Sequence, residues 1–101
     1  IEIDGHKFDS QAEGRRYSEL KLQQHCGVIK NLELQPSFIL QAKFKYNGKP
    51  ERAIKYVADF KYDKDGQMII EDVKGKKTKV YLLKRKMLLF NYPDINFVET
   101  A

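Results

Sequence analysis

The chain has 101 residues, of which 42% are hydrophobic and 33% charged, and its formal net charge is +5. This apolar content is too high for a disordered chain, and no apolar run approaches the roughly 18 residues that a membrane span needs. The length suits one domain over residues 1–101, and a single cysteine excludes a disulfide framework. No signal peptide is visible, so we expect a soluble, cytoplasmic protein with no membrane partner.

The first predicted element is a helix over residues 9–25. Ser10 can act as its N-cap, and Glu13, three residues later, completes the S-x-x-E pattern of a capping box. Glu13, Tyr17 and Leu20 recur at helical spacing, so they share one face, and this face carries large apolar groups. We therefore expect Glu13 to point toward the core, either as a capping residue or as an acid of a functional site.

Three strands are predicted after this helix. The first begins at Leu32 and continues through Phe44, with Pro36 near its start, as is typical of an edge or entry position. The second covers residues 53–62, in which aromatic and apolar side chains alternate along one face. The third, residues 68–74, has consecutive apolar residues, which indicates burial on both faces.

A second helix is predicted over residues 76–91, ending before Pro93. Its apolar stripe consists of Val80, Leu83, Met87, Leu88 and Phe90. A short last strand follows over residues 95–98. The resulting order, αβββαβ, predicts an α/β fold in which helices flank a central mixed sheet.

The turn between the second and third predicted strands determines which side chains face each other. If Asp65-Gly66 forms the two-residue type I′ turn that this dipeptide favours, Asp59 lies directly opposite Asp72. A register shifted by one residue would place Glu71 there instead. In either case two acidic residues face each other with Cβ atoms roughly 5 Å apart, which is destabilising unless one is protonated or a cation lies between them.

Lys74 lies two residues beyond Asp72 and therefore on the same face. With Glu13, the two aspartates provide three hard oxygen donors, a set that suits Mg²⁺ or Mn²⁺ rather than Zn²⁺ or Cu²⁺. Such a site can hold a divalent ion against a phosphate while the lysine orients water and offsets charge on the phosphate oxygens. The expected chemistry is phosphodiester hydrolysis. The structural alternatives are a cross-paired strand acid at Asp59 and a surface ion pair between Asp72 and Lys74.

No acidic residue interrupts the segment from Lys74 to Lys86. This run can supply an electrostatic track for a phosphate backbone, or it can be a solvated helix face. The candidate nucleic-acid-binding residues are Lys76, Lys77, Lys79, Lys84 and Lys86.

These residues resemble the signature of the PD-(D/E)XK, or restriction-endonuclease-like, nucleases, in which an Asp is followed by (D/E)-x-K on the next strand. Asp59 and the triplet Asp72-Val73-Lys74 carry the signature. The segments 8–22, 56–60 and 71–75 are similar to a phage-associated family of small proteins in that superfamily. Two positions depart from the usual pattern: Ala58 replaces proline before Asp59, and Asp replaces Glu in the triplet.

By this resemblance, Asp59 and Asp72 would be metal ligands, the Val73 carbonyl a further ligand, and Lys74 the catalytic lysine. Glu13 matches an acid that Holliday-junction resolvases of the superfamily place on their first helix. The resemblance implies a Mg²⁺-dependent endonuclease, with Mn²⁺ able to substitute, that acts on branched DNA in phage recombination or replication. An enzyme that cuts a junction must nick two strands, which favours a homodimer. A phage-encoded protein of this kind is expected in the cytoplasm of the bacterial host. The alternatives are a non-cleaving nucleic-acid-binding module and a nuclease subunit that needs a partner.

Overall fold

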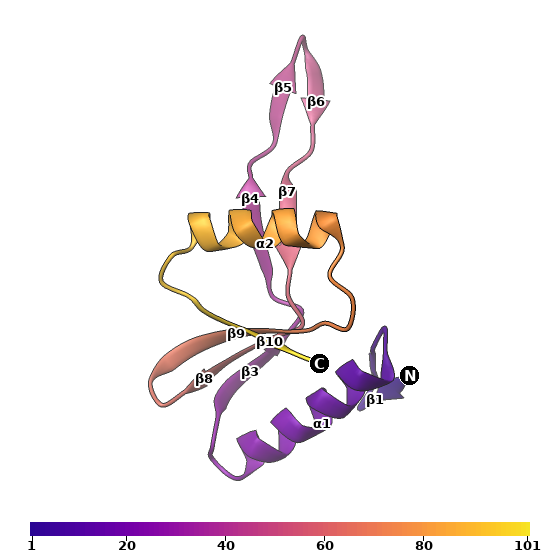
Figure 1. The fold of residues 1–101 in the computed structure, drawn as a ribbon, viewed down its shortest axis with the longest axis vertical. Coiled ribbons are helices and arrows are strands. Elements are labelled where there is room, and N and C mark those ends of the chain that lie inside the picture. The colour runs from indigo at the N-terminus through magenta and orange to yellow at the C-terminus, as the bar shows by residue number, and fades with distance from the viewer.

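Two helices and ten short strands make up the computed structural model, which describes all of residues 1–101 (Figure 1). The helices are α1 (Gln11–His25) and α2 (Lys79–Asn91). The largest sheet has the order β10-β9-β8-β3, formed by β10 (Asn96–Thr100), β9 (Gln67–Val73), β8 (Phe60–Lys64) and β3 (Lys30–Leu34). Because β10 is parallel to β9 and the other pairs are antiparallel, this sheet is mixed, as predicted.

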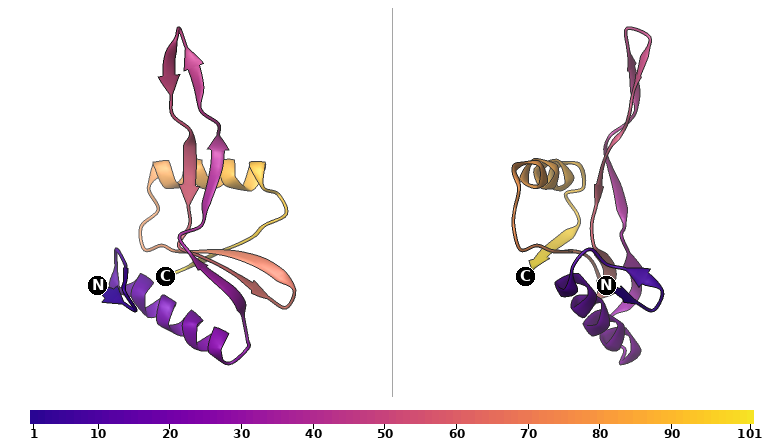
Figure 2. Two further views of the ribbon diagram at one scale, coloured as in Figure 1. Left: turned by 180° about the vertical axis from the view of Figure 1, so that it is seen from behind. Right: turned by 90° about the vertical axis from the view of Figure 1, so that its right-hand side faces the viewer.

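The remaining strands pair in twos. They are β1 (Glu2–Ile3) with β2 (His6–Lys7), β4 (Ser37–Gln41) with β7 (Ile54–Val57), and β5 (Phe44–Tyr46) with β6 (Lys49–Glu51). The last two pairs form one long twisted hairpin that projects from the rest of the molecule (Figures 1 and 2). This hairpin accounts for the elongated shape, whose principal extents are 53 × 31 × 24 Å.

The predicted first helix is confirmed, beginning two residues later than expected. The Ser10 hydroxyl caps it by accepting a hydrogen bond from the backbone N–H of Glu13 at 3.1 Å. The shared face of Glu13, Tyr17 and Leu20 is buried, also as predicted. This face joins a hydrophobic cluster with Phe8, Ile29, Phe60, Tyr62 and Ile69, so α1 packs on one side of the four-stranded sheet.

The β8–β9 hairpin has the predicted register. Both residues of its turn, Asp65-Gly66, have positive φ angles, of 52° and 77°, as a type I′ turn requires. The ladder pairs Phe60 with Glu71, so the next position places Asp59 across from Asp72. The alternative register, with Glu71 opposite Asp59, is therefore wrong.

Two of the predicted strands are divided in the structure. The strand predicted over residues 53–62 is broken between β7 and β8, and the one predicted from Leu32 is broken between β3 and β4. Both breaks lie side by side, because the N–H of Gln35 donates to the Asp59 carbonyl and the N–H of Ala58 donates to the Pro36 carbonyl, each at 3.0 Å. The paired chains change direction together here, which leaves Asp59 at the junction between the four-stranded sheet and the hairpin.

The second helix ends at Asn91 as predicted, but its buried face is not the predicted one. It begins at Lys79, after Thr78 caps it. Leu88 is fully buried and Met87 partly so, whereas Val80, Leu83 and Phe90 are 63%, 59% and 82% exposed. The predicted apolar stripe is therefore wrong at these three positions.

The packing of α2 explains the error. The helix lies across β4 and β7 rather than over the centre of the four-stranded sheet (Figure 2). It presents Tyr81 and Leu88 to Leu40, Tyr56, Ala58 and Ile70. The α/β class with a mixed sheet is confirmed, but a single central sheet flanked by both helices is not, because α2 packs mainly on the β4–β7 hairpin. Neither helix is long and apolar enough to cross a membrane.

Candidate functional site

Asp59 and Asp72 are held together by hydrogen bonds between neighbouring strands. The N–H of Asp59 donates to Asp72 Oδ1 at 2.8 Å, and the N–H of Val73 donates to Asp59 Oδ2 at 2.7 Å. The Tyr56 hydroxyl donates to Asp72 Oδ2. Three of the four carboxylate oxygens thus have a protein donor, and Asp59 Oδ1 has none. The predicted pair of facing acids is present where the sheet and the hairpin meet.

The surroundings of Asp59 make its negative charge unfavourable. Burial raises the pKa of its carboxyl above the ordinary value, and the nearby Asp72 raises it further. The Val73 N–H and the Lys74 ammonium group act in the opposite direction without cancelling the rise. A cation bound beside Asp59, in addition to the Lys74 ammonium group, would therefore stabilise the ionised form of Asp59.

Glu13 reaches the same group of charges from the start of α1. The residue is only 6% exposed, although its carboxylate oxygens still reach solvent. The carboxylate makes no hydrogen bond, so it does not complete the capping box with Ser10. Burial raises its pKa from 4.5 to about 7, and Asp59 and Asp9 add to the rise, while Lys74 opposes it. The capping interpretation thus explains Ser10 but leaves the Glu13 carboxylate without a structural role.

Lys74 follows directly after β9 and lies within reach of these acids. Its backbone N–H donates to the Thr100 carbonyl at 2.7 Å, which fixes the start of the side chain. Its Nζ lies 4.8 Å from the centre of the Tyr81 ring and makes no ion pair. Asp72 is only 1% exposed and bonds to Tyr56 and Asp59 instead. The alternative of a surface ion pair between Asp72 and Lys74 is therefore wrong.

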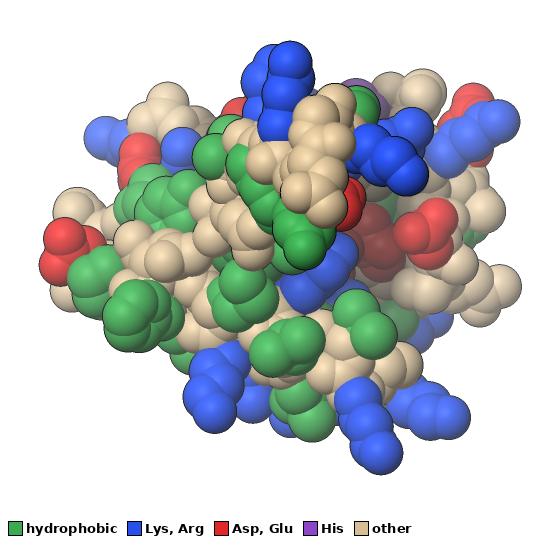
Figure 3. Space-filling view, turned by 90° about the horizontal axis from the view of Figure 1, so that it is seen from above, with side chains coloured by type: hydrophobic (Ala, Val, Ile, Leu, Met, Phe, Trp, Pro, Cys, Tyr) green, Lys and Arg blue, Asp and Glu red, His purple; other side chains and the backbone are tan.

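A cleft opens beside Asp72, between β7 and the beginning of α2. Three lysines line it, Lys55 from β7, Lys74 after β9 and Lys84 from α2, together with buried Asp72 and Tyr81. The β9–α2 connection and the start of α1 lie on one side of the molecule in Figure 1. Figure 3 shows acidic side chains at the bottom of a hollow on this side, with basic side chains around it. The arrangement combines a recessed negative charge with a positive rim.

The structure divides the predicted lysine run. Lys77 pairs with Glu99 at 3.5 Å, and this carboxylate also accepts hydrogen bonds from Tyr81 and Arg85. Lys84 faces the cleft. The remaining members, Lys76, Lys79 and Lys86, are exposed and form no ion pair.

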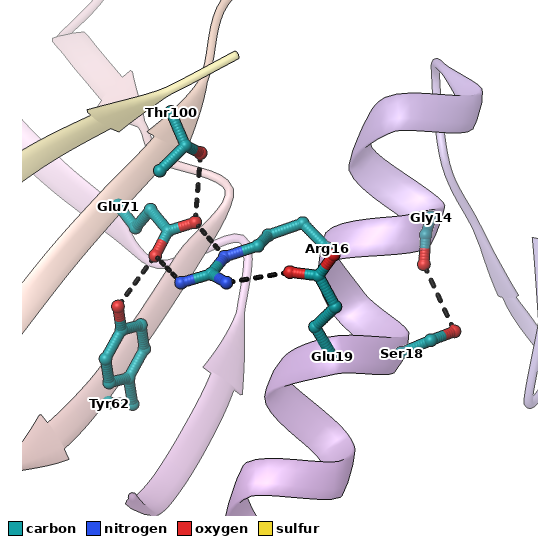
Figure 4. Close-up of polar contacts among 7 residues, drawn as sticks. All are labelled: Gly14, Arg16, Ser18, Glu19, Tyr62, Glu71 and Thr100. Atoms are coloured by element: carbon teal, nitrogen blue, oxygen red, sulfur yellow. Dashed lines mark hydrogen bonds and ion pairs between the residues drawn. The ribbon is translucent and has the colours of Figure 1, made fainter.

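Glu71 precedes Asp72 in β9, so its side chain points to the other face of the strand. Figure 4 shows it in contact with Arg16, Tyr62 and Thr100. It accepts hydrogen bonds from Arg16 Nε at 2.6 Å, from the Tyr62 hydroxyl at 2.6 Å and from the Thr100 hydroxyl at 3.1 Å. Burial acts to raise its pKa, but these hydrogen bonds hold the pKa below the ordinary value. Glu71 thereby ties α1 to the sheet, and Arg16 lies three residues after Glu13, so this contact fixes the part of α1 that carries Glu13.

Two residues of the site could not be identified from the sequence pattern. Arg16 sits in an ordinary charged helix segment, and only its contact with Glu71 shows that it positions α1. Lys55 lies four residues before Asp59 in the same chain segment, but it lines the same cleft as Lys74 only because of how the β4–β7 hairpin is placed beside the end of β9. The nearness of Lys55 to Asp59 in the sequence is the only available signal.

The donor set fits a hard divalent cation, although the side chains do not form a complete metal cluster. No three acidic, histidine or cysteine side chains surround one point. The group nevertheless offers oxygen donors only, with Asp59 Oδ1 and the Glu13 carboxylate lacking protein donors. The N–H and C=O of one strand residue point toward the same neighbouring strand. Because the Val73 N–H donates to Asp59, the Val73 carbonyl also points toward the chain segment that carries Asp59. Asp59, Asp72, Glu13 and this carbonyl are the groups that could hold Mg²⁺.

Comparison with protein families gives a match that covers almost the whole chain. Residues 1–100 match the model of the family described as "Protein of unknown function (DUF1064)", so the chain belongs to this family. A search of curated proteins finds no match. Because the match spans both helices and all the strands, Glu13, Asp59, Asp72 and Lys74 all lie within the family unit.

Proposed function

We propose that this protein is a Mg²⁺-dependent endonuclease that hydrolyses phosphodiester bonds in branched or otherwise structured DNA. One observation carries the proposal. The carboxylates of Asp59 and Asp72 are held on neighbouring strands by hydrogen bonds from backbone N–H groups, and Lys74, which forms no ion pair, lies beside them. Asp is uncommon in strands, and two facing carboxylates are unfavourable in the absence of a cation. The same residues carry the resemblance to the PD-(D/E)XK signature.

Each residue has a role that follows from its surroundings. Asp59, Asp72, Glu13 and the Val73 carbonyl would hold the metal ion, which would supply Lewis-acid stabilisation of charge on the phosphate when bound. Lys74, free of ion pairs, orients the attacking water and offsets negative charge on the phosphate oxygens. Tyr56 holds Asp72 in place through its hydroxyl.

The cleft beside the acids is suited to a phosphate backbone. Lys55 and Lys84 face it from two elements and can contact phosphates on either side of the bond to be cut. A domain of this size has little room for a sequence-reading element, so DNA shape and phosphate contacts are expected to determine recognition. We infer that four-way junctions and flaps are better substrates than linear duplex.

A junction cutter must nick two strands, and we infer a symmetric homodimer on this ground. The corresponding setting is the cytoplasm of a bacterial host, where phage DNA recombines and replicates. Light scattering of the purified chain, alone and with a four-way junction, tests the dimer. A monomer bound to the junction would contradict it.

The activity is tested by incubating the purified chain with labelled four-way junction, flap, duplex and single-stranded DNA. Each substrate is tested with Mg²⁺, with Mn²⁺ and with EDTA. We expect cutting of the branched substrates with either metal and none with EDTA. Absence of cutting on all four substrates would contradict the proposal for the isolated chain.

A second candidate function is a non-cleaving DNA-binding module, or a nuclease subunit that needs a partner to complete its site. The observation that favours it is that the acidic side chains do not surround one point. Junction binding that is equally tight with Mg²⁺ and with EDTA, without any cutting, would support this candidate.

A further inference from the structure

The projecting end of the hairpin, residues 42–53, is hereafter called the arm. Its two strands, β5 and β6, are joined by Asn47-Gly48, both with positive φ. All arm residues except Ala53 are exposed, and no helix packs against β5 or β6. An isolated two-stranded hairpin is marginally stable in water, so a chain that projects one is expected to use it in contact with something else.

The charge of the hairpin indicates what that partner is. Residues 41–55 contain five basic residues and one acidic residue, a net charge of +4, when the whole chain carries +5. The five are Lys43, Lys45, Lys49, Arg52 and Lys55, and none of them forms an ion pair. In the view down the hairpin, basic side chains project around its end (Figure 3). This surface is complementary to a polyanion.

Two aromatic side chains accompany the basic ones. Phe44 and Tyr46 are exposed on one face of β5, and Tyr46 lies opposite Lys49 in the ladder. Exposed aromatic rings beside lysines are suited to contact with sugars and bases as well as phosphates. A two-stranded ribbon also fits the major groove of B-form DNA, which is about 12 Å wide.

The arm is connected directly to the candidate catalytic residues. From Asn47 at the turn to Asp59 the chain runs almost entirely extended, and at about 3.3 Å per residue it spans roughly 40 Å. This length is close to one helical turn of duplex DNA, about 34–36 Å. Lys55 lies along this path and lines the cleft with Lys74. Basic side chains therefore continue from the cleft to the turn.

We propose that the arm is a DNA-binding β-ribbon that contacts a duplex about one helical turn from the bond held at Asp59. The proposal rests on the proposed function for the position of that bond, but it concerns binding and can be tested without cutting. The arm would then favour substrates that have a sufficiently long duplex next to the branch point.

The test compares two triple variants with equal loss of charge. The arm variant is Lys45→Ala, Lys49→Ala and Arg52→Ala, and the control is Lys21→Ala, Lys30→Ala and Lys64→Ala, which are exposed elsewhere. Junction affinity is measured in EDTA over a range of salt concentrations, with junction arms of about half a helical turn and about two turns. Thermal unfolding confirms that both variants are folded.

We expect the wild type and the control to bind long-armed junctions more tightly than short-armed ones. The arm variant should lose this preference, bind the long junction at least about tenfold more weakly, and lose about 2–3 from the salt slope. An unchanged slope in the arm variant, or a wild type that binds no DNA, would overturn the proposal. Arm-dependent binding without cutting in Mg²⁺ would contradict the nuclease function alone, leaving the role of the arm intact.

Discussion

Replacing Glu13 with glutamine should stabilise the protein at neutral and alkaline pH in the absence of divalent metal. Glu13 is a largely buried residue whose carboxylate makes no hydrogen bond, and partial desolvation and the nearby Asp59 raise its pKa from 4.5 to about 7 on folding. A pKa difference of about 2.5 corresponds to an upper limit of about 3.4 kcal/mol, at about 1.4 kcal/mol per pKa unit. The Glu13 carboxylate oxygens still reach solvent, which screens the charges around them, so only part of this limit is realised. We therefore expect Glu13→Gln to raise the free energy of unfolding by about 1 kcal/mol.

The effect should depend on pH in a defined direction. Below the unfolded pKa of 4.5, Glu13 is protonated in both states and carries no penalty. Between 4.5 and about 7 the unfolded chain ionises more readily than the folded one, so this residue lowers the stability as pH rises. Above about 7 the penalty is constant. The variant and the wild type should therefore be similar near pH 4 and differ most near pH 8.

The assay is thermal or urea unfolding in EDTA at both pH values. A gain of about 1 kcal/mol corresponds to a melting temperature about 5 °C higher for a chain of this size. Glu33→Gln is the matched control, because its side chain is 56% exposed and only 3.6 Å from Lys61, and its stability should change by less than about 0.5 kcal/mol. A destabilised Glu13→Gln protein, or an equal difference at both pH values, would refute the reasoning.

Further predictions concern the metal and the contact that positions α1. Millimolar Mg²⁺ should raise the melting temperature of the wild type but not of Asp59→Asn, since a ligand that binds only the folded state stabilises it; equal shifts in both proteins would remove Asp59 from the metal site. Arg16→Ala should lower the free energy of unfolding by about 3–5 kcal/mol, because it leaves Glu71 buried without its charged partner. Arg15→Ala, exposed on the same helix, is the control for urea unfolding, and equal losses in the two variants would contradict this role.

The parts of the site that depend on local chemistry could be predicted from the sequence. The dipeptide Asp65-Gly66 favours one turn type, and this turn alone places Asp59 opposite Asp72. The Ser10 cap likewise depends on residues within one helical turn. The capping pattern also fitted Glu13, and only the structure shows that its carboxylate does not take part.

The parts that depend on how distant elements pack could not be predicted. The buried face of α2 is selected by the β4–β7 hairpin that it crosses, and apolar spacing alone did not distinguish Leu88 from Val80, Leu83 and Phe90. The strand breaks beside Asp59 arise from backbone hydrogen bonds between two segments far apart in the sequence. The contact of Arg16 with Glu71 joins residues 55 positions apart, for which a single sequence gives no signal.

The central claim is that Asp59, Asp72 and Lys74 together cut DNA. The most direct test measures how fast Lys74→Ala cleaves the preferred branched substrate under single-turnover conditions. Junction affinity in EDTA is measured in parallel, with Lys64→Ala, at the far end of β8 from Asp59, as the control. The account predicts that Lys74→Ala cuts at least about a hundredfold more slowly and binds the junction as tightly as the wild type. A wild-type cleavage rate in Lys74→Ala would contradict it.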